Sequence, residues 1–448
     1  MTDRHQRRAR AIARLKVLRR CALIAAIELL VLLVLLIRWG VKSVKASDTG
    51  TAVQTVEQAE TQATQATQVS QDAQDAQTGE IEQTAETEQA AEASQVTQTV
   101  SDKNDDDSLH VITAQDAAAL RGDTAEEEAT PTPEPTPESY PVIDVFGDTQ
   151  GYSAVYRVGD TVYELYNYSE DAAVLYTDAV NELAADLKGV SDVYCMIIPT
   201  SAGIMAPDAL WDDDSVMIGN QEEPYSKFMA KLSDDVVKVP IFDTLMRHRN
   251  EYIYFRTDHH WTQLGAYYAY VEFCKAKGIE YHELEEYPVT VFDNFLGTFY
   301  DNTGNNSQVG GNPDTVYVYG PISQSATMDI IMPDGTECYG MDVIYDESNA
   351  APGLKYGCFI ASDNAFTTIT NPEVTDGSSC IIIKESFGNC FAPLLVDHYS
   401  TVYVVDYRYW SGSVSEFARE NGVDDIIFAN NISTLRGTSA VAAIISVM

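Results

Sequence analysis

Apolar and polar positions along the C-terminal part of the chain alternate in blocks that have the lengths of strands and helices. Short runs of consecutive apolar residues that end at turn residues predict buried strands, and apolar residues at three- and four-residue spacing predict helices. The predicted strands are 193–199, 236–242, 380–384, 401–405 and 425–429, and the predicted helices are 224–233, 262–277 and 413–421. This alternation predicts an α/β domain with a mainly parallel sheet and helices on both of its faces.

The helix predicted at 262–277 has the clearest boundaries, because Thr262 can cap its first turn and Gly278 can end it. Between about 279 and 379 the pattern changes to short runs of Val, Tyr and Ile separated by Gly, Pro, Asn and Asp. Such runs predict a β-rich insertion within a domain that spans 141–448.

A basic and then apolar segment opens the chain. Residues 1–45 hold 11 Lys and Arg against 2 acids, and an apolar run extends from about 22 to 37. We expect a cytoplasmic segment at 1–20 and a single transmembrane helix at 21–41, which would place the domain outside the cell and anchor it in the cell membrane. A cleaved signal peptide ending at Val44-Lys45-Ala46 is the alternative, and it also exports the domain.

Residues 42–140 are rich in Thr, Gln, Ala, Glu, Ser and Asp, and they end in alternating prolines from Pro131 to Pro137. A segment with so few large apolar residues cannot offset the entropy lost on ordering. It predicts a disordered linker with a stiff polyproline-type end.

Charge and cysteine content restrict the function. The formal net charge is −40, divided into +9 over 1–45 and −49 over the remainder, which argues against nucleic-acid binding. The seven cysteines include no CxxC pair, which argues against a zinc framework. Cys338 and Cys358 are the first choice for a disulfide, with buried free thiols as the alternative.

Two segments carry residues suited to acyl chemistry. Asp258-His259-His260-Trp261 places a carboxylate beside two histidines, and a carboxylate can orient an imidazole that takes a proton from a nucleophile. Ser386 follows the predicted strand 380–384, so it would lie at the carboxyl edge of the sheet, where sites form in open α/β sheets. We expect Ser386 to attack an acyl carbonyl, with His260 as general base and Asp258 orienting it.

Three further side chains extend this hypothesis. Asn389 is a candidate oxyanion donor, although it could equally cap a turn. His259 and Arg408 are candidates for substrate binding, although Arg408 could equally pair with one of the many acids.

A metal site made of Asp258, His259 and His260 is the less favoured alternative, because adjacent histidines rarely both reach one ion. We therefore expect no metal and no cofactor.

The segments TDHHW, TQLGAYYAY, KESFGNCFAP and VYVVDYRYW, in this order, resemble the bacterial DHHW family. That family is similar to SGNH-hydrolase-like proteins that O-acetylate exported polysaccharides such as alginate. The resemblance covers most of 141–448 and implies a three-layer α/β/α sandwich with a metal-free Ser-His-Asp triad, matched here by Ser386, His260 and Asp258. The GDS signature of such proteins is absent, since Lys384-Glu385-Ser386 stands in its place.

The resemblance also implies a cell-surface polysaccharide as the substrate and a neighbouring membrane-bound acyltransferase that exports acyl groups. Three functions follow from these observations. The first is an extracytoplasmic serine O-acyltransferase that transfers an acetyl group to a polysaccharide. The second is a carbohydrate esterase of the same fold, and the third is a surface protein that binds glycan without catalysis.

Overall fold

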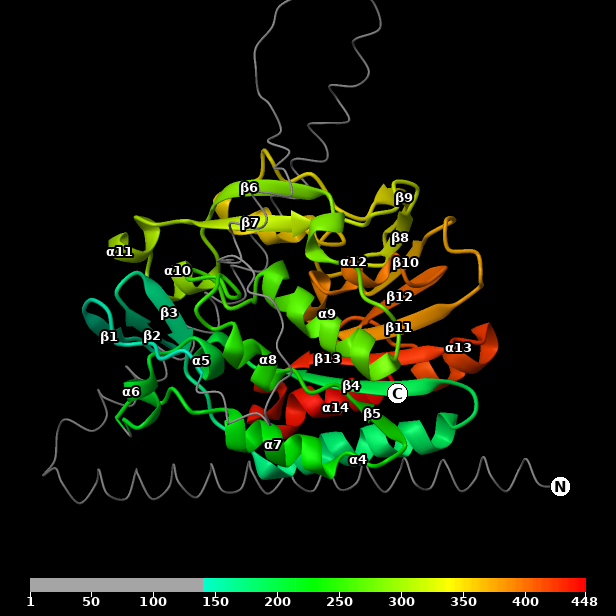
Figure 1. The fold of residues 1–448 in the computed structure, drawn as a ribbon, viewed down its shortest axis with the longest axis horizontal. Coiled ribbons are helices and arrows are strands. Elements are labelled where there is room, and N and C mark those ends of the chain that lie inside the picture. The colour runs from blue at the N-terminus through cyan, green and yellow to red at the C-terminus, as the bar shows by residue number, and fades with distance from the viewer. Residues whose placement is uncertain (1–139, 214) are drawn as a thin grey trace, which may run out of the picture. The chain divides into compact units, whose positions relative to one another are not determined.

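The computed structural model describes residues 140–213 and 215–448 (Figure 1). The predicted cytoplasmic segment at 1–20, the membrane helix at 21–41 and the linker at 42–140 fall outside the described residues, apart from Tyr140. Among the helices that are described, none is both long and apolar enough to cross a membrane.

The centre of the domain is an eight-stranded sheet with the order β5-β4-β13-β11-β12-β10-β8-β9. Its strands are β4 (Asp192–Ile198), β5 (Val236–Lys238), β8 (Thr327–Ile331), β9 (Glu337–Asp342), β10 (Phe366–Thr370), β11 (Ser379–Lys384), β12 (Thr401–Asp406) and β13 (Asp425–Asn431). The five strands from β5 to β12 pair in parallel, and β10, β8 and β9 continue the sheet in antiparallel pairing. The prediction of an α/β domain with a mainly parallel sheet is confirmed.

Two smaller sheets flank this one. They consist of β1 (Thr149–Gly151), β2 (Val155–Val158) and β3 (Thr161–Glu164), and of β6 (Val289–Phe295) and β7 (Asp314–Tyr319). The helices are α4 (Glu170–Leu187), α5 (Ser201–Ile204), α6 (Asp208–Trp211), α7 (Glu222–Lys231), α8 (Phe242–Arg247), α9 (Gln263–Lys277), α10 (Thr298–Asn302), α11 (Ser307–Gly310), α12 (Ala392–Leu395), α13 (Val414–Asn421) and α14 (Thr438–Ser446). Short 3-10 turns form η2 (Leu284–Glu286), η3 (Pro352–Cys358), η4 (Ser386–Asn389) and η5 (Ile432–Arg436).

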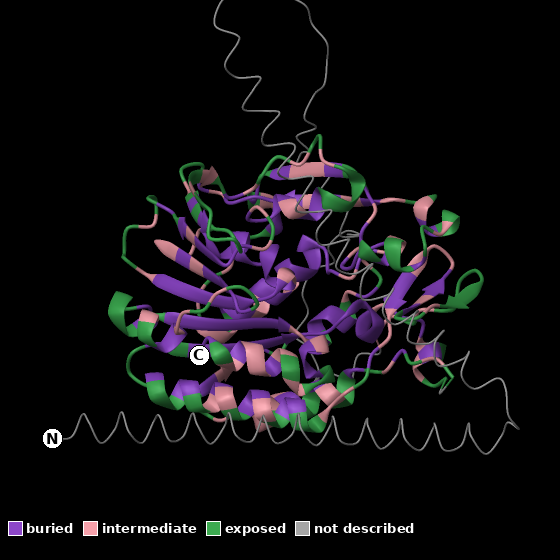
Figure 2. Cartoon of the chain, turned by 180° about the vertical axis from the view of Figure 1, so that it is seen from behind, coloured by how far each residue is buried: buried purple, intermediate pink, exposed green. Residues whose placement is uncertain are grey.

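Helices cover both faces of the central sheet. Tyr194 of β4 packs edge-on against Phe273 of α9, and Tyr176 of α4 packs against Phe428 of β13. Phe428 pairs with Cys195 in the sheet register, so the side chains of these two residues point to the same face. Cys195 directly follows Tyr194, and successive strand residues point to opposite faces, so Tyr194 and Phe428 point to opposite faces. Helices α4 and α9 therefore lie on opposite sides, and the strands between them are buried along their length (Figure 2).

Burial on both faces explains why β11 and β13 read as continuous apolar runs. All six residues of β11 are buried, and six of the seven residues of β13 are buried. Central parallel strands have no solvated side, so alternation of polar and apolar residues disappears.

Helix α9 begins and ends where the sequence predicts. The Thr262 hydroxyl accepts a hydrogen bond from the Gly265 N–H at its start, and Gly278 adopts the left-handed conformation at its end.

Three predictions need correction. The strand expected at 236–242 ends at Lys238, and Phe242 already opens α8. The segment 279–379 is β-rich as predicted, since it holds β6 to β10, but only β6 and β7 form their own sheet, while β8, β9 and β10 extend the central one. The Cys338–Cys358 disulfide is wrong: Cys338 lies in the edge strand β9 and Cys358 in the core, and all six described cysteines are free thiols.

Candidate active site

Ser386 is the first residue of the turn η4 and lies at the carboxyl edge of the central sheet. Strand β11 runs between β12 and β13, parallel to both, and ends at Lys384. Ser386 is partly exposed, whereas Glu385 and Phe387 on either side are buried. The fold therefore presents this one hydroxyl where the strand ends.

His260 joins Ser386 to Asp258. Nε2 of His260 lies 2.7 Å from Oγ of Ser386, and Nδ1 lies 2.6 Å from Oδ1 of Asp258. An ionised carboxylate only accepts hydrogen bonds, so Nδ1 must carry a proton and a neutral His260 offers Nε2 as the acceptor for the Ser386 hydroxyl. The structure thus brings together the three side chains that the sequence singles out, in the order that proton transfer from Ser386 requires.

The second oxygen of Asp258 is held by the loop that follows β6. Oδ2 accepts hydrogen bonds from the backbone N–H of Thr298 at 2.8 Å and from its hydroxyl at 3.1 Å. Gly297 immediately precedes Thr298, and a β-carbon there would lie 2.2 Å from Oδ2 of Asp258. The close approach of this backbone to the carboxylate requires glycine at position 297.

Burial and the neighbouring charges set the ionisation of these groups. Burial alone would raise the pKa of Asp258, but His259 and His260 outweigh it, so this pKa lies well below its usual value. Burial, followed by the positive charge of His259, lowers the pKa of His260 to about 4 despite the nearby Asp258. His260 is therefore neutral near pH 7, which is the state that a general base needs.

Residues 139–405, more than half of the chain, match the family model described as DHHW protein. The chain belongs to the DHHW family. A comparison with curated proteins finds no match.

Several solved structures are similar to this one. A DHHW family protein from Eubacterium siraeum DSM 15702 has 26% sequence identity and a TM-score of 0.60, with 67% of this chain and 97% of that chain covered. Bacillus cereus PatB1 with a sulfonyl adduct has 19% identity and a TM-score of 0.54, with 64% and 97% covered. The O-acetyltransferase domain of Pseudomonas putida AlgJ has 12% identity and a TM-score of 0.36, with 66% and 98% covered. The likeness to PatB1 indicates a shared fold, and the likeness to AlgJ is too weak to carry further weight.

Two aromatic residues connect the DHHW segment to the serine turn. The Trp261 indole N–H donates to the carbonyl oxygen of Phe387 at 2.9 Å. The Tyr356 hydroxyl donates to the carbonyl oxygen of Ser386 at 2.9 Å, and the Tyr356 ring stacks on His260 with the ring centroids 3.9 Å apart. These contacts fix both the plane of the imidazole and the backbone that carries Oγ.

A buried ionic network holds the other side of the serine turn. Nζ of the fully buried Lys384 lies 2.9 Å from Asp406 and 3.2 Å from Asp363. Arg408 contacts the same two carboxylates, at 2.6 Å and 2.8 Å. Burial would raise the pKa of Asp363, but Lys384 and Arg408 outweigh it and lower this pKa. The sequence predicts that Arg408 either binds substrate or pairs with acids. In the structure its guanidinium is paired with two acids.

Asn389 shares this network, since its amide nitrogen donates to Asp363 at 3.0 Å. The first N–H of the Asn389 amide is thus bound to Asp363, so an oxyanion role for Asn389 would depend on the second N–H of this amide.

Asp363 reaches the network from a tight turn, because Ile360, Ala361 and Ser362 all adopt positive φ angles, between 48° and 69°. Left-handed backbone is strained for residues with a β-carbon, and a β-branched residue rarely adopts it.

The residues of the DHHW segment also offer atoms that could hold a metal. Ligand atoms of Asp258, His259 and His260 lie within 4.8 Å of one another. Both ring nitrogens of His260 are already hydrogen-bonded, to Asp258 and to Ser386. An ion bound through Nε2 would have to displace the Ser386 hydroxyl, so the geometry favours proton transfer at this site.

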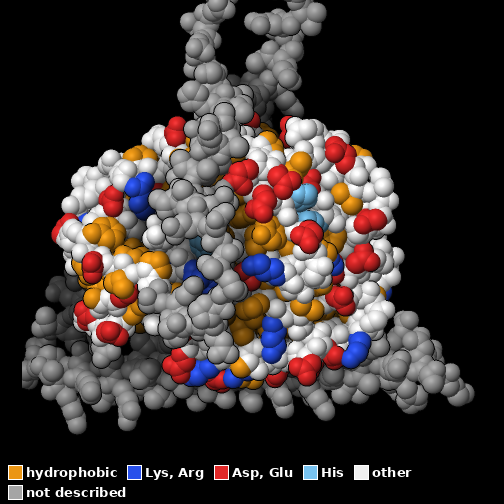
Figure 3. Space-filling view, in the orientation of Figure 1, with side chains coloured by type: hydrophobic (Ala, Val, Ile, Leu, Met, Phe, Trp, Pro, Cys, Tyr) orange, Lys and Arg blue, Asp and Glu red, His pale blue; other side chains and the backbone are white. Residues whose placement is uncertain are grey.

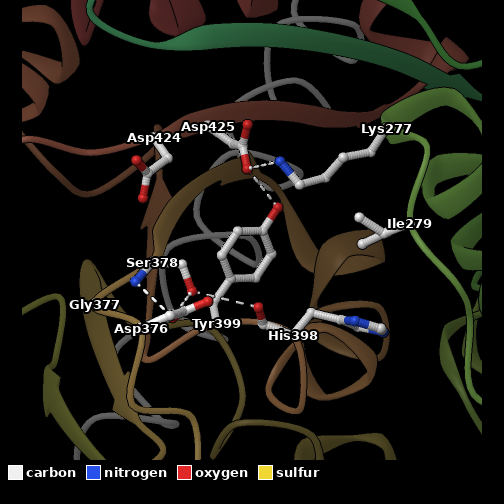
Figure 4. Close-up of a pocket in the computed structure, with 9 residues that line it drawn as sticks. All are labelled: Lys277, Ile279, Asp376, Gly377, Ser378, His398, Tyr399, Asp424 and Asp425. Atoms are coloured by element: carbon white, nitrogen blue, oxygen red, sulfur yellow. Dashed lines mark hydrogen bonds and ion pairs between the residues drawn. The ribbon is translucent and has the colours of Figure 1, made fainter.

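Figure 4 shows a surface pocket whose lining includes Ser378 and Asp424. These two residues directly precede β11 and β13, so the pocket lies at the amino edge of the sheet, at least about 20 Å from Ser386 along the strands. Its acids are already paired, for example Asp425 with Lys277 at 2.6 Å and with Tyr399 at 2.7 Å. It therefore has no direct part in chemistry at Ser386.

The sequence alone did not identify four residues that complete the site. They are Gly297, Thr298, Tyr356 and Asp363, and each comes from the segment 279–379. Gly297 indicates a turn at 295–300 from the sequence, but the contact of this turn with Asp258 depends on a pairing across 40 residues. No local pattern distinguishes Tyr356 or Asp363 from the many other tyrosines and acids of this chain.

Proposed function

We propose that this protein is an extracytoplasmic serine O-acyltransferase that transfers an acetyl group to a cell-surface polysaccharide. The observation that carries the proposal is the unbroken hydrogen-bonded chain from Asp258 through His260 to Ser386. The resemblance of the DHHW segment and of the serine segment to SGNH-hydrolase-like O-acetyltransferases supports the same reaction. The helices on both faces of the sheet fit the three-layer sandwich of that group.

In the first half-reaction, Oγ of Ser386 attacks the carbonyl carbon of an acyl donor while His260 takes the hydroxyl proton through Nε2. The donor's leaving group departs with the proton that His260 then gives up, and the acyl group remains as an ester on Ser386. Asp258 holds His260 in the required tautomer and stabilises its charged form. Tyr356 keeps the imidazole plane in place by stacking.

In the second half-reaction, an acceptor hydroxyl attacks the acyl carbon and His260 takes its proton. The bond between the acyl carbon and Oγ of Ser386 breaks, and His260 returns the proton to Ser386. A sugar hydroxyl as the acceptor gives the O-acetylated polysaccharide, whereas water gives an esterase. The choice between these two outcomes therefore depends on which acceptor reaches the acyl-serine.

The place of this reaction in the cell is proposed from the sequence. The basic segment at 1–20 and the apolar run at 22–37 support a single-pass anchor with the domain outside the cell. In that location an acyl donor has to be supplied across the membrane, which supports a membrane-bound acyltransferase as partner. The polysaccharide at the cell surface would be the acceptor.

Covalent labelling tests the proposal. The full-length protein is incubated with 4-nitrophenyl acetate, or with phenylmethylsulfonyl fluoride, and its intact mass is measured. The second reagent is suggested by the sulfonyl adduct of PatB1. We expect one acetyl or one sulfonyl group per chain, and none in Ser386→Ala. The exposed Ser446→Ala serves as the matched control and should label like the wild type. Equal labelling of the wild type and Ser386→Ala would contradict the proposal.

A further inference from the structure

Several partly exposed polar residues lie beside Ser386 at the carboxyl edge of the sheet. Glu164 is the last residue of β3, His259 lies in the DHHW segment, Asn431 is the last residue of β13 and Ser433 lies in η5. Each of these four is partly exposed, and both sequence neighbours of His259, Asn431 and Ser433 are buried. We call them the edge strip. The mechanism above uses none of them.

Hydrogen bonds connect the edge strip to the serine turn. Asn431 donates from its backbone N–H at 3.1 Å and from its amide at 3.2 Å to Oε1 of Glu385, the neighbour of Ser386. Oδ1 of Asn431 accepts from the Ser433 N–H at 2.8 Å, and the Ser433 hydroxyl donates to Oε2 of Glu164 at 3.0 Å. Two carboxylates, Glu385 and Glu164, are therefore held on either side of the end of β13.

His259 offers a free nitrogen next to the base. Its ring centroid lies 3.8 Å from that of His260, and its side chain is 32% exposed. Nδ1 lies 2.7 Å from the Thr298 hydroxyl, which already donates its own proton to Asp258, so Nδ1 must be the donor. Within residues 140–213 and 215–448 we find no hydrogen bond to Nε2 of His259.

Strand β3 brings Glu164 to this place. The Val162 N–H donates to the carbonyl oxygen of Arg256 at 3.0 Å, so β3 runs beside the segment that leads into Asp258. Glu164 follows Val162 by two residues and lies on the same side of the strand. Its carboxylate is close enough to His259 for each to affect the other's pKa: burial raises the pKa of Glu164, and His259 partly opposes this.

We propose that Glu164, held by Ser433, and His259, held by Thr298, form the subsite for the acyl acceptor, and that this acceptor is a hydroxyl-rich saccharide without negative charge. The inference rests on the proposed function and specifies the class of its acceptor. Carboxylates accept hydrogen bonds from sugar hydroxyls, and Nε2 of His259 adds one more bonding atom. Glu164, Glu385 and Asp258 would repel an anionic glycan at this edge.

The charge of the whole domain agrees with this choice. Residues 141–448 hold 15 Lys and Arg against 45 Asp and Glu, a net charge of −30. Acidic side chains are scattered over the face shown in Figure 3. Such a field lowers the local concentration of polyanions and leaves neutral saccharides unaffected. The role assigned to Glu164 and His259 is to position the acceptor hydroxyl, while His260 remains the base that takes its proton.

Partitioning of the acyl-serine tests the inference. The full-length protein is given 4-nitrophenyl acetate together with cellopentaose, and acetylated pentasaccharide and free acetate are both measured. A neutral amide oxygen accepts a weaker hydrogen bond than a carboxylate, so Glu164→Gln should lower the ratio of transfer to hydrolysis by about tenfold. Ser433→Ala, which removes one hydrogen bond that holds the Glu164 carboxylate, should lower it as well. The exposed Glu420→Gln on α13 is the matched control and should keep the wild-type ratio.

The same assay with an anionic acceptor tests the acceptor class. A mannuronate pentamer replaces cellopentaose at equal concentration, and we expect transfer to cellopentaose to exceed transfer to the anionic oligomer. A better reaction with the mannuronate pentamer would overturn this acceptor class. Wild-type ratios in both Glu164→Gln and Ser433→Ala, with Ser386 still acetylated, would overturn the subsite while leaving the proposed function intact. Absence of any acetyl adduct on wild-type Ser386 would overturn the proposed function, and the inference with it.

Discussion

A β-carbon on Gly297 would lie 2.2 Å from Oδ2 of Asp258, well inside the distance at which two atoms can be in contact. The contact is tight because the next residue, Thr298, donates its backbone N–H to that oxygen at 2.8 Å. The loop after β6 thus works as a backbone clamp on the carboxylate that orients His260. Any side chain at position 297 must displace either the loop or Asp258.

We therefore expect Gly297→Ala to slow acetylation of Ser386 by about 100-fold, since a displacement of about 1 Å in a reacting geometry has that effect. The rate is measured from the burst of 4-nitrophenolate. Gly437→Ala is the matched control, because a β-carbon at Gly437 has no atom within 4 Å. An unchanged burst rate in Gly297→Ala would show that Asp258 tolerates movement and does not orient the base.

Tyr356 gives a second prediction, because its ring and its hydroxyl act on different residues. Tyr356→Phe keeps the stacking on His260 and loses the hydrogen bond to the Ser386 carbonyl oxygen, at a cost of about 1 kcal/mol in unfolding free energy. Tyr356→Ala loses both and leaves a cavity, at a cost of about 3–5 kcal/mol. Urea unfolding measures both values.

Acetylation rates separate the two roles of Tyr356. We expect Tyr356→Phe to keep most of the burst rate, because the imidazole plane is unchanged, and Tyr356→Ala to lose most of it. If both variants acetylate Ser386 equally well, stacking has no part in orienting His260. If Tyr356→Phe is as slow as Tyr356→Ala, the hydrogen bond to the serine backbone is the more important contact.

The parts of the site that the sequence could predict are those that depend on short-range patterns. Thr262 and Gly278 mark the ends of α9, and Asp258 and His260 bond across two residues. The position of Ser386 can be predicted because Ser386 follows a buried parallel strand, and sites in open α/β sheets form beyond the carboxyl ends of such strands. Ser386 lies 126 residues after His260 in the chain, and this separation is bridged by tertiary contacts such as the packing of α9 against the sheet and the hydrogen bond from Trp261 to Phe387.

The parts that the sequence could not predict depend on pairing between distant strands. Short runs such as β8 and β10 look alike whether they form their own sheet or extend another, since register and partner are not encoded locally. For the same reason the contacts of Asp363 with Lys384 and Asn389 cannot be predicted from the sequence. The strained turn from Ile360 to Ser362 contains no glycine, so even its left-handed backbone had no signal in the sequence.

The buried network below the serine turn gives a third prediction. Lys384→Met keeps most of the side-chain volume but removes the cation between Asp363 and Asp406, leaving Arg408 to neutralise both. Breaking a buried ion pair on one side costs about 3–5 kcal/mol, and we expect a loss of this size in the unfolding free energy. Lys188→Met removes the exposed Lys188–Asp235 pair and should cause no measurable change.

The network also holds the serine turn, because Asp363 accepts a hydrogen bond from Asn389 in the same turn as Ser386. We expect Lys384→Met to slow acetylation of Ser386 under conditions where the variant is still folded by circular dichroism. A stable variant with the wild-type burst rate would show that the ionic network is separate from the chemistry. A loss of stability without any change in rate would assign Lys384 to the fold alone.

The pH dependence of acetylation gives the last prediction. Protonated His260 cannot take the Ser386 proton, so the rate falls as the pH drops through the pKa of His260, which burial and the charge of His259 lower to about 4. We expect a burst rate that is constant from about pH 8 to about pH 5 and half-maximal near pH 4. The measurement is stopped-flow release of 4-nitrophenolate, corrected for the absorbance of the phenol at each pH.

His259→Gln tests the cause of this shift. Glutamine removes the positive charge that opposes protonation of His260, so the pKa of His260 must rise and the half-maximal rate must move to higher pH. Burial remains in the variant, so the midpoint should stay below the ordinary histidine value of about 6.5. A wild-type midpoint near pH 6.5 would show that His260 is far better solvated than the structure indicates. A midpoint that does not move in His259→Gln would leave burial as the whole cause and remove His259 from the electrostatics of the base.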